Sequence, residues 1–208
     1  MADIGQIIKR LKEHYPAAKI SLDYQTPLEL VVAVILSAQC TDKRVNLITP
    51  ALFAKYKTCR DYIEAPKEEL ERLIFSAGFY RAKAKNIKGM ATILESKFGG
   101  KLPSTIEEML ELPGVARKTA NVVLGELYGT SEGFTVDTHV IRLSRRLGLA
   151  KKKTPKDIEI DLIRIVPKDE RISLAHRLIA HGRSLCPARS PKCRECFLRD
   201  ICPSAKGD

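Results

Sequence analysis

Capping patterns at three places in the sequence mark the starts of α-helices. A Ser or Thr precedes an acidic residue by three positions in residues 26–29 (TPLE), 104–107 (STIE) and 154–157 (TPKD). In this pattern the hydroxyl accepts a hydrogen bond from the helix backbone, and the acid can bond back to the cap. Apolar residues recur at helical spacing in residues 4–11 and 87–94, and no segment shows the sustained alternation of a β-strand. The sequence therefore predicts an all-α protein of about ten short helices.

The sequence contains no stretch long enough to cross a membrane. The longest run without a charged residue, residues 30–41, has 12 residues, whereas a transmembrane helix needs about 20 apolar residues. The first 13 residues carry five charged side chains, unlike the apolar middle of a secretory signal. We expect a soluble, intracellular monomer of the cytoplasm or nucleoid, without a membrane partner.

Positive charge is in excess and unevenly distributed. The chain has 36 Lys and Arg against 25 Asp and Glu, which gives a net charge of +11. Residues 72–101 hold seven basic side chains and one acid, and residues 171–206 hold eight basic side chains and two acids. Two basic segments suggest a polyanionic partner, although solvated basic faces on an ordinary soluble protein give the same pattern.

Four of the six cysteines fall within 17 residues, with the spacing C-x6-C-x2-C-x5-C; they are Cys186, Cys193, Cys196 and Cys202. Disulfides are rare in a reducing interior, so a metal centre is the favoured explanation. Four thiolates can hold one tetrahedral zinc ion. They can equally hold the separate irons of a [4Fe-4S] cluster. Arg189 and Lys192, between the ligands, would either contact phosphates or offset the negative charge of the thiolates.

A Pro-Gly turn in residues 112–120 (LPGVARKTA) leads into an apolar helical run. Such a turn exposes backbone N–H groups at the start of the second helix, where the partial positive charge favours an anion such as phosphate. Arg117 and Lys118 place two cations in that first turn, against the helix dipole. Either both side chains neutralise phosphate, or Lys118 is a nucleophilic amine of the Schiff-base type.

Asp137 lies in residues 136–139 (VDTH), directly before the apolar residues Val140, Ile141 and Leu143. Its carboxylate can cap the helix that follows. It is also the natural acidic partner for Lys118, because it can stabilise a developing cation or relay a proton. The four histidines lack the spacing of metal ligands, and we assign them structural roles.

In combination, these motifs resemble the endonuclease III family of DNA glycosylases, in the helix-hairpin-helix superfamily. The signatures occur in family order: residues 36–42 (LSAQCTD), 78–80 (GFY), 112–120, 136–139 and the cysteine run. The resemblance implies two helical lobes that flank a DNA-binding cleft. One lobe is a six-helix barrel with the helix-hairpin-helix, at residues 20–131. The other is discontinuous, joins residues 1–19 to 132–208, and carries a [4Fe-4S] cluster on the four clustered cysteines.

The resemblance also implies base excision repair of damaged double-stranded DNA. Lys118 would attack C1′ of a flipped-out oxidised pyrimidine nucleotide, expel the base and cleave the strand by β-elimination through a Schiff base, with Asp137 assisting. Flipping is required because C1′ is shielded inside the duplex. Gln39 would fill the vacated gap and Phe79, unless it is a core aromatic, would wedge into the stack. Further DNA contacts are expected from Arg81, Lys83, Gly114, Ala116, Arg189 and Lys192.

Three positions depart from the family pattern. Phe79 stands where Leu is common, Ala116 where a second hairpin Gly is usual, and Cys40 where Ala is frequent. A left-handed backbone at Ala116 would cost about 1–2 kcal/mol, so we expect this residue to be helical.

Two other functions compete with this interpretation. A monofunctional, mismatch-specific glycosylase of the same superfamily would generally lack a lysine at position 118. A noncatalytic DNA-binding metal protein would use Lys118 for phosphate contact and the cysteines for zinc.

Overall fold

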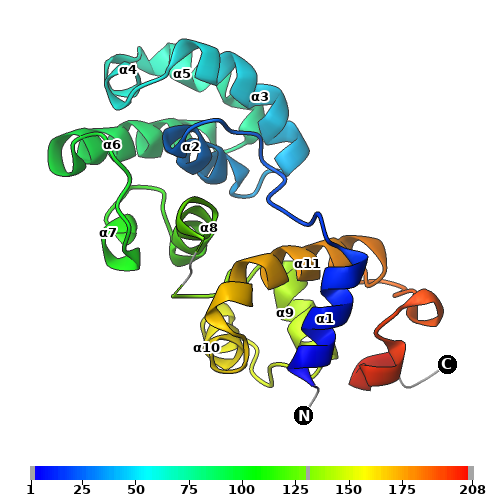
Figure 1. Ribbon diagram of the computed structural model, residues 1–208. Coiled ribbons are helices and arrows are strands. Elements are labelled where there is room, and N and C mark those ends of the chain that lie inside the picture. Colours follow the sequence, from blue (N-terminus) through cyan, green and yellow to red (C-terminus); the bar gives the residue numbers. More distant parts are fainter. Residues whose placement is uncertain (1–2, 130–131, 206–208) are drawn as a thin grey trace. The chain divides into compact units, whose positions relative to one another are not determined.

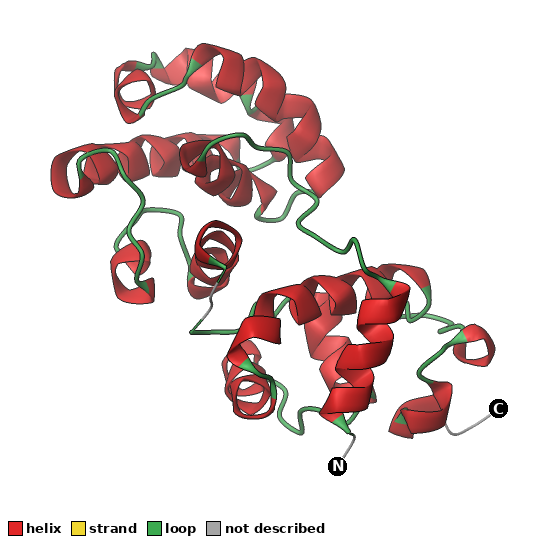
Figure 2. Cartoon of the chain, viewed as in Figure 1, coloured by secondary structure: helices red, strands yellow, loops and turns green. Residues whose placement is uncertain are grey.

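The predicted all-α class is confirmed. The structure, a computed structural model, describes residues 3–129 and 132–205, and these residues form only helices and loops (Figures 1 and 2). They contain eleven α-helices and five short 3-10 helices. Within these residues, no helix has the length and apolar character needed to cross a membrane.

The chain divides into two compact units. Ser21–Leu127 forms one, which we call the central unit. Met1–Ile20 and Tyr128–Asp208 together form the other, the terminal unit. The boundary predicted at residue 131 falls within residues 130–131, which lie outside the described residues.

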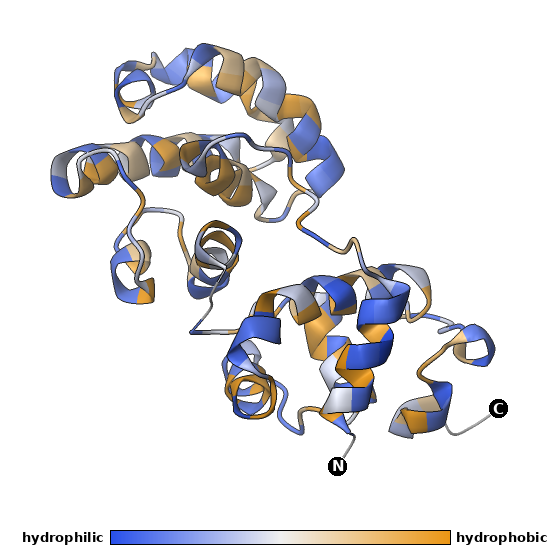
Figure 3. Ribbon diagram, in the orientation of Figure 1, coloured by the Kyte–Doolittle hydropathy of each residue, from blue (hydrophilic) through white to orange (hydrophobic). Residues whose placement is uncertain are grey.

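The helices of the central unit are α2 (Pro27–Ser37), α3 (Asp42–Lys55), α4 (Cys59–Glu64), α5 (Lys67–Leu73), η1 (Phe75–Ala77), α6 (Tyr80–Phe98), α7 (Ile106–Leu110) and α8 (Arg117–Tyr128), which ends at the boundary. Residues 30–36 of α2 are all buried, and the helix is largely orange in Figure 3. Both α3 and α6 pack against it. A helix that is apolar on every face has to be surrounded, so α2 lies in the core.

The helices of the terminal unit are α1 (Ile4–His14), α9 (Thr138–Arg146), α10 (Pro155–Ile165), η2 (Lys168–Glu170), α11 (Arg171–Ser184), η3 (Cys193–Glu195), η4 (Arg199–Ile201) and η5 (Pro203–Ala205). Its core joins residues from the two ends of the chain. Ile7 and Leu11 of α1 are fully buried in one cluster with Leu143 of α9, Leu178 of α11 and Leu198. The N-terminal helix is therefore an integral part of this unit.

Two of the three predicted caps are confirmed, and the third is shifted. The Thr26 hydroxyl accepts from the Glu29 N–H, and the Thr154 hydroxyl accepts from the Asp157 N–H. The prediction for Ser104 is wrong by one residue, because Thr105 caps α7 instead. Adjacent hydroxyls make such a cap ambiguous, and here the position of buried Ile106 selects Thr105.

At position 114, in the hairpin turn between α7 and α8, only glycine fits without strain. Gly114 has a φ of +81°, and a Cβ built on it would lie 2.9 Å from the Cβ of Asn86. Ala116 is not among the described non-glycine residues with positive φ, as we expected. The alanine at position 116, where the family usually has glycine, therefore does not adopt a left-handed backbone.

We predict that Gly114→Ala destabilises the protein more than Gly99→Ala. Each change places a side chain on a left-handed backbone, which lowers the free energy of unfolding by about 1–2 kcal/mol. Only Gly114→Ala also meets a neighbour, because nothing lies within 4 Å of a Cβ at Gly99. Urea unfolding followed by circular dichroism gives the two free energies, and equal losses would contradict the close approach to Asn86.

Candidate active site and metal centre

Lys118 lies in the first turn of α8, directly after the hairpin turn. Val115 is buried and anchors the turn, whereas Gly114, Ala116 and Lys118 are exposed. The first turn of α8 contains no acidic residue, so the cationic side chains add to the positive end of the helix dipole. The hairpin thus presents an amine and a helix N-terminus to solvent on the same turn.

Asp137 is the N-cap of α9 in the terminal unit. Its Oδ1 accepts a hydrogen bond from the Val140 N–H at 2.8 Å, and the residue is half-buried. Val136 and Val140 on either side are buried, so the backbone that carries the carboxylate is anchored. The capping role predicted from the sequence is confirmed, and it holds the carboxylate in one orientation.

Gln39 and Phe79 lie on two turns of the central unit and share an unusual backbone. Gln39 has a φ of +53° and Phe79 a φ of +46°; among the described residues, Ser190 is the third non-glycine with positive φ. This conformation costs about 1–2 kcal/mol for an L-residue, and such residues cluster at functional sites. Phe79 is 66% exposed, so it is not a core aromatic.

The turn that carries Phe79 has further exposed groups. The side chain of Arg81 is exposed, its Nε lies 4.0 Å from Glu71 Oε2, and its guanidinium lies over the Tyr80 ring at 5.4 Å. Sequence reasoning missed Phe75, which is 63% exposed and packs on the same Tyr80 ring, 4.9 Å between centroids. The sequence did contain a signal for it, because Phe75 and Phe79 stand four positions apart on either side of Gly78.

The prediction that Lys83 is a DNA contact is corrected by the structure. Lys83 is 5% exposed, and its Nζ donates to the carbonyl oxygens of Leu36 at 2.7 Å and Ala77 at 2.9 Å. Burial lowers the pKa of this amine. A side chain that uses its ammonium on two internal carbonyls is not available to a phosphate.

All four clustered cysteines line one cavity in the terminal unit, and none of them forms a disulfide; they are Cys186, Cys193, Cys196 and Cys202. Within the described part of the chain, no three or more His, Cys, Asp or Glu side chains lie close enough together to hold a metal ion. Burial raises the pKa of the Cys196 and Cys202 thiols above the ordinary value for cysteine. Arg189 and Lys192 are exposed on the loop between the first two cysteines.

Polar side chains outside the cysteine loop, residues 186–202, lie close to its sulfur atoms. Arg146 of α9 donates from Nη1 to Cys186 Sγ at 3.1 Å and to the Pro187 carbonyl at 2.8 Å. His181 Nε2 lies 3.6 Å from Cys196 Sγ. Sequence reasoning missed both residues, because Arg146 is 40 and His181 is 15 positions away from its sulfur along the chain, and neither belongs to a motif.

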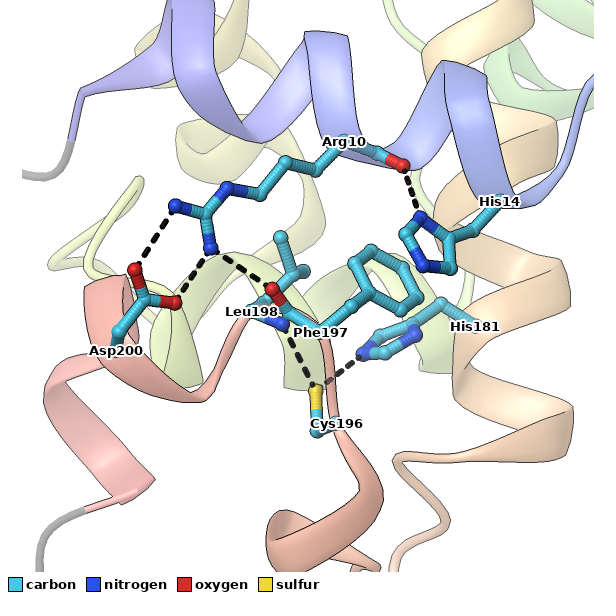
Figure 4. Close-up of polar contacts among 7 residues, drawn as sticks. All are labelled: Arg10, His14, His181, Cys196, Phe197, Leu198 and Asp200. Atoms are coloured by element: carbon cyan, nitrogen blue, oxygen red, sulfur yellow. Dashed lines mark hydrogen bonds and ion pairs between the residues drawn. The ribbon is translucent and has the colours of Figure 1, made fainter.

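Helix α1 clasps the segment that follows Cys196 (Figure 4). The two terminal nitrogens of Arg10 bind the two carboxylate oxygens of Asp200, and Nη1 also donates to the Phe197 carbonyl at 2.8 Å. The rings of His14 and Phe197 are stacked, 3.6 Å apart and 9° from parallel. The guanidinium of Arg10 and backbone donors hold the pKa of Asp200 below its usual value. The N-terminal helix thereby fixes one side of the cysteine loop.

The comparisons with known proteins agree with this arrangement. Residues 32–168 match the HhH-GPD superfamily of base excision DNA repair proteins. Endonuclease III of Synechocystis sp. is 52% identical over 97% of this chain and 92% of its own length. Endonuclease III of Bacillus subtilis is 45% identical over 97% of this chain and 94% of its own length.

Solved structures show the same likeness along the whole chain. The structure of a trapped endonuclease III–DNA covalent intermediate has a TM-score of 0.91 and 43% identity, and the match covers 99% of this chain and 98% of that one. A thermostable thymine-DNA glycosylase, at 22% identity and a TM-score of 0.85, shares the fold. This chain therefore belongs to the endonuclease III family, within the HhH-GPD superfamily of base excision DNA repair proteins.

Proposed function

We propose that this protein excises oxidised pyrimidines from duplex DNA and cleaves the abasic strand, with Lys118 as the nucleophile. Its family makes it a DNA glycosylase and lyase of base excision repair. One observation carries the assignment of Lys118. Its exposed amine stands in the first turn of α8, where the helix dipole disfavours a cation and stability alone would select an acid.

In the proposed reaction, the neutral amine of Lys118 attacks C1′ of the flipped nucleotide. The new N–C1′ bond forms as the glycosidic bond breaks, and the base leaves with the electron pair and takes up a proton. The attached nitrogen gives up a proton, the C1′–O4′ bond breaks and O4′ takes up a proton, which opens the sugar ring and forms the Schiff base. Loss of a proton from C2′ of this Schiff base then expels the 3′ phosphate by β-elimination. Asp137, held by the N–H of Val140, supplies the negative charge that stabilises the developing cation or relays a proton.

Gln39 and Phe79 are proposed to hold the duplex open. The exposed side chain of Phe79 would wedge between stacked bases, and Gln39 would occupy the gap left by the flipped nucleotide. The remaining proposed DNA contacts are all exposed and would bind phosphates with little sequence preference; they are Arg81, Gly114, Ala116, Arg189 and Lys192.

We infer that the four clustered cysteines hold a [4Fe-4S] cluster. Their thiols surround a cavity, as ligands of four separate irons must, and Arg146 donates to one of the sulfurs. When bound, the cluster gives the loop a single rigid shape. Arg189 and Lys192 would then stand at defined positions for phosphate contact. We further propose that the central unit corresponds to the barrel lobe and the terminal unit to the cluster-bearing lobe.

Replacing Lys118 tests the nucleophile. We predict that Lys118→Gln still binds abasic duplex DNA but yields no borohydride-trapped adduct and no strand cleavage, because the attacking amine is gone. Lys101→Gln, which removes an exposed lysine outside the site, should trap normally. Normal trapping by Lys118→Gln would identify another amine as the nucleophile. Excision without trapping by the unchanged protein would favour the monofunctional alternative.

Replacing Asp137 separates catalysis from capping. Asn caps a helix about as well as Asp, so Asp137→Asn should keep the free energy of unfolding, whereas Asp137→Ala should lose about 1 kcal/mol. We predict that Asp137→Asn nevertheless slows base excision about 100-fold or more. Asp3→Asn is the matched control, because Asp3 caps α1 with the same chemistry. Normal excision by Asp137→Asn would reduce the residue to a cap.

Metal analysis tests the cluster. We predict that the purified protein is yellow-brown and holds about four iron and four sulfide ions per chain. Changing any one of the four clustered cysteines to Ala should lower the iron content and destabilise the terminal unit, because the coordination shell opens. Cys40→Ala and Cys59→Ala should leave the iron content unchanged. One zinc ion per chain with no visible absorption would reject the cluster.

A further inference from the structure

The buried ammonium of Lys83 joins two turns of the central unit. Lysine is rarely buried without a partner, and among the described residues no carboxylate pairs with this one. Its Nζ instead donates to the carbonyls of Leu36 and Ala77, which are 47 and 6 residues away along the chain. The first carbonyl belongs to the end of α2 and the second to the end of η1.

Both carbonyls need a donor at these positions. In a continuing helix, the Leu36 carbonyl would accept from the N–H of Cys40, but that N–H bonds to the Ser37 carbonyl at 3.1 Å. The end of a helix also carries a partial negative charge, which favours a cation. Ala77 ends η1 immediately before Gly78, which has a φ of +70°. The ammonium of Lys83 therefore donates to carbonyls at the C-terminal ends of two helices, α2 and η1.

Each joined turn carries one of the residues proposed to enter the duplex. Gln39 follows Leu36 by three positions, and Phe79 follows Ala77 by two; both have a left-handed backbone. Such a backbone persists only when its surroundings hold it in place. Two side chains that must enter one opened base stack also need a fixed separation, because a misplacement of about 1 Å costs up to about 100-fold in rate.

We propose that Lys83 is a positioning residue that holds the Gln39 turn and the Phe79 turn together, so that the two side chains enter the duplex at a fixed separation. The inference rests on the proposed function of Gln39 and Phe79. Lys83 itself touches no DNA. Its contribution is to spare the complex the cost of ordering two independent turns when the base is flipped.

The test compares Lys83→Met with Lys88→Met. Methionine keeps the length and most of the buried volume of the lysine stem and removes the ammonium. Lys88 is the matched control, since it also lies on α6 and its Nζ also donates to two backbone carbonyls, those of Ile63 and Ala65. Neither of these residues has a positive φ.

Two readouts separate positioning from general damage. The first is the rate of borohydride trapping on abasic duplex divided by the rate on the same strand alone, where little stacking has to be opened. We expect Lys83→Met to lower this ratio about 10-fold to 100-fold and Lys88→Met to leave it unchanged. The second is the fluorescence of 2-aminopurine beside the abasic site, which rises when the stack opens. That rise should be smaller with Lys83→Met.

Parallel variants distinguish failure of the inference from failure of the proposed function. If Gln39→Ala and Phe79→Ala leave the ratio unchanged, the gap-filling and wedge roles fail, and the inference fails with them. If they lower it while folded Lys83→Met behaves like Lys88→Met, only the inference is overturned. Lys83→Gln replaces Lys83→Met if the latter does not fold. Loss of fold in both, with Lys88→Met folded, would assign the ammonium to stability alone and overturn the positioning role.

Discussion

Burial of α2 organises the central unit. Seven consecutive residues, 30–36, each keep at most 8% of their surface exposed, and α3 and α6 pack against the helix. Because α2 is enclosed, its last carbonyls cannot all reach water, and an internal donor is required. Lys83 supplies that donor at Leu36. Gln39 lies on the turn that follows α2. The helix that forms the core therefore also fixes the position of a residue proposed to contact DNA.

The terminal unit depends on contacts between the two ends of the chain. Apolar residues of α1 complete the core of α9, α10 and α11, whereas the cysteine loop contributes Leu198 as its one fully buried hydrophobic residue among those described. Phe197 and Ile201 of the loop pack against this core while only partly buried. Polar contacts also hold the loop, from Arg10 to Asp200 and from Arg146 to the Cys186 region. Partly exposed ion pairs contribute little stability. The proposed cluster would therefore supply much of the order of this loop.

Most of the fold was accessible from the sequence because helix signals are local. The caps at Thr26, Thr154 and Asp137 depend on residues within three positions, and each is present. The Ser104 cap failed for the same reason, since two adjacent hydroxyls satisfy the local rule equally well. In the structure Thr105 is the cap, and Ile106, the next residue, is buried in the core.

The sequence by itself determined that the chain is helical, that four thiols lie within one short segment, and that Lys118 stands against its helix dipole. Each of these follows from residues a few positions apart. Only the tertiary structure decided that Lys83 is internal, because its partner carbonyl at Leu36 lies 47 residues away. The same holds for Arg146 at Cys186, 40 residues away, and for Arg10 at Asp200, 190 residues away. A basic side chain has the same local pattern whether it meets solvent or a buried carbonyl, and only packing between distant segments distinguishes the two.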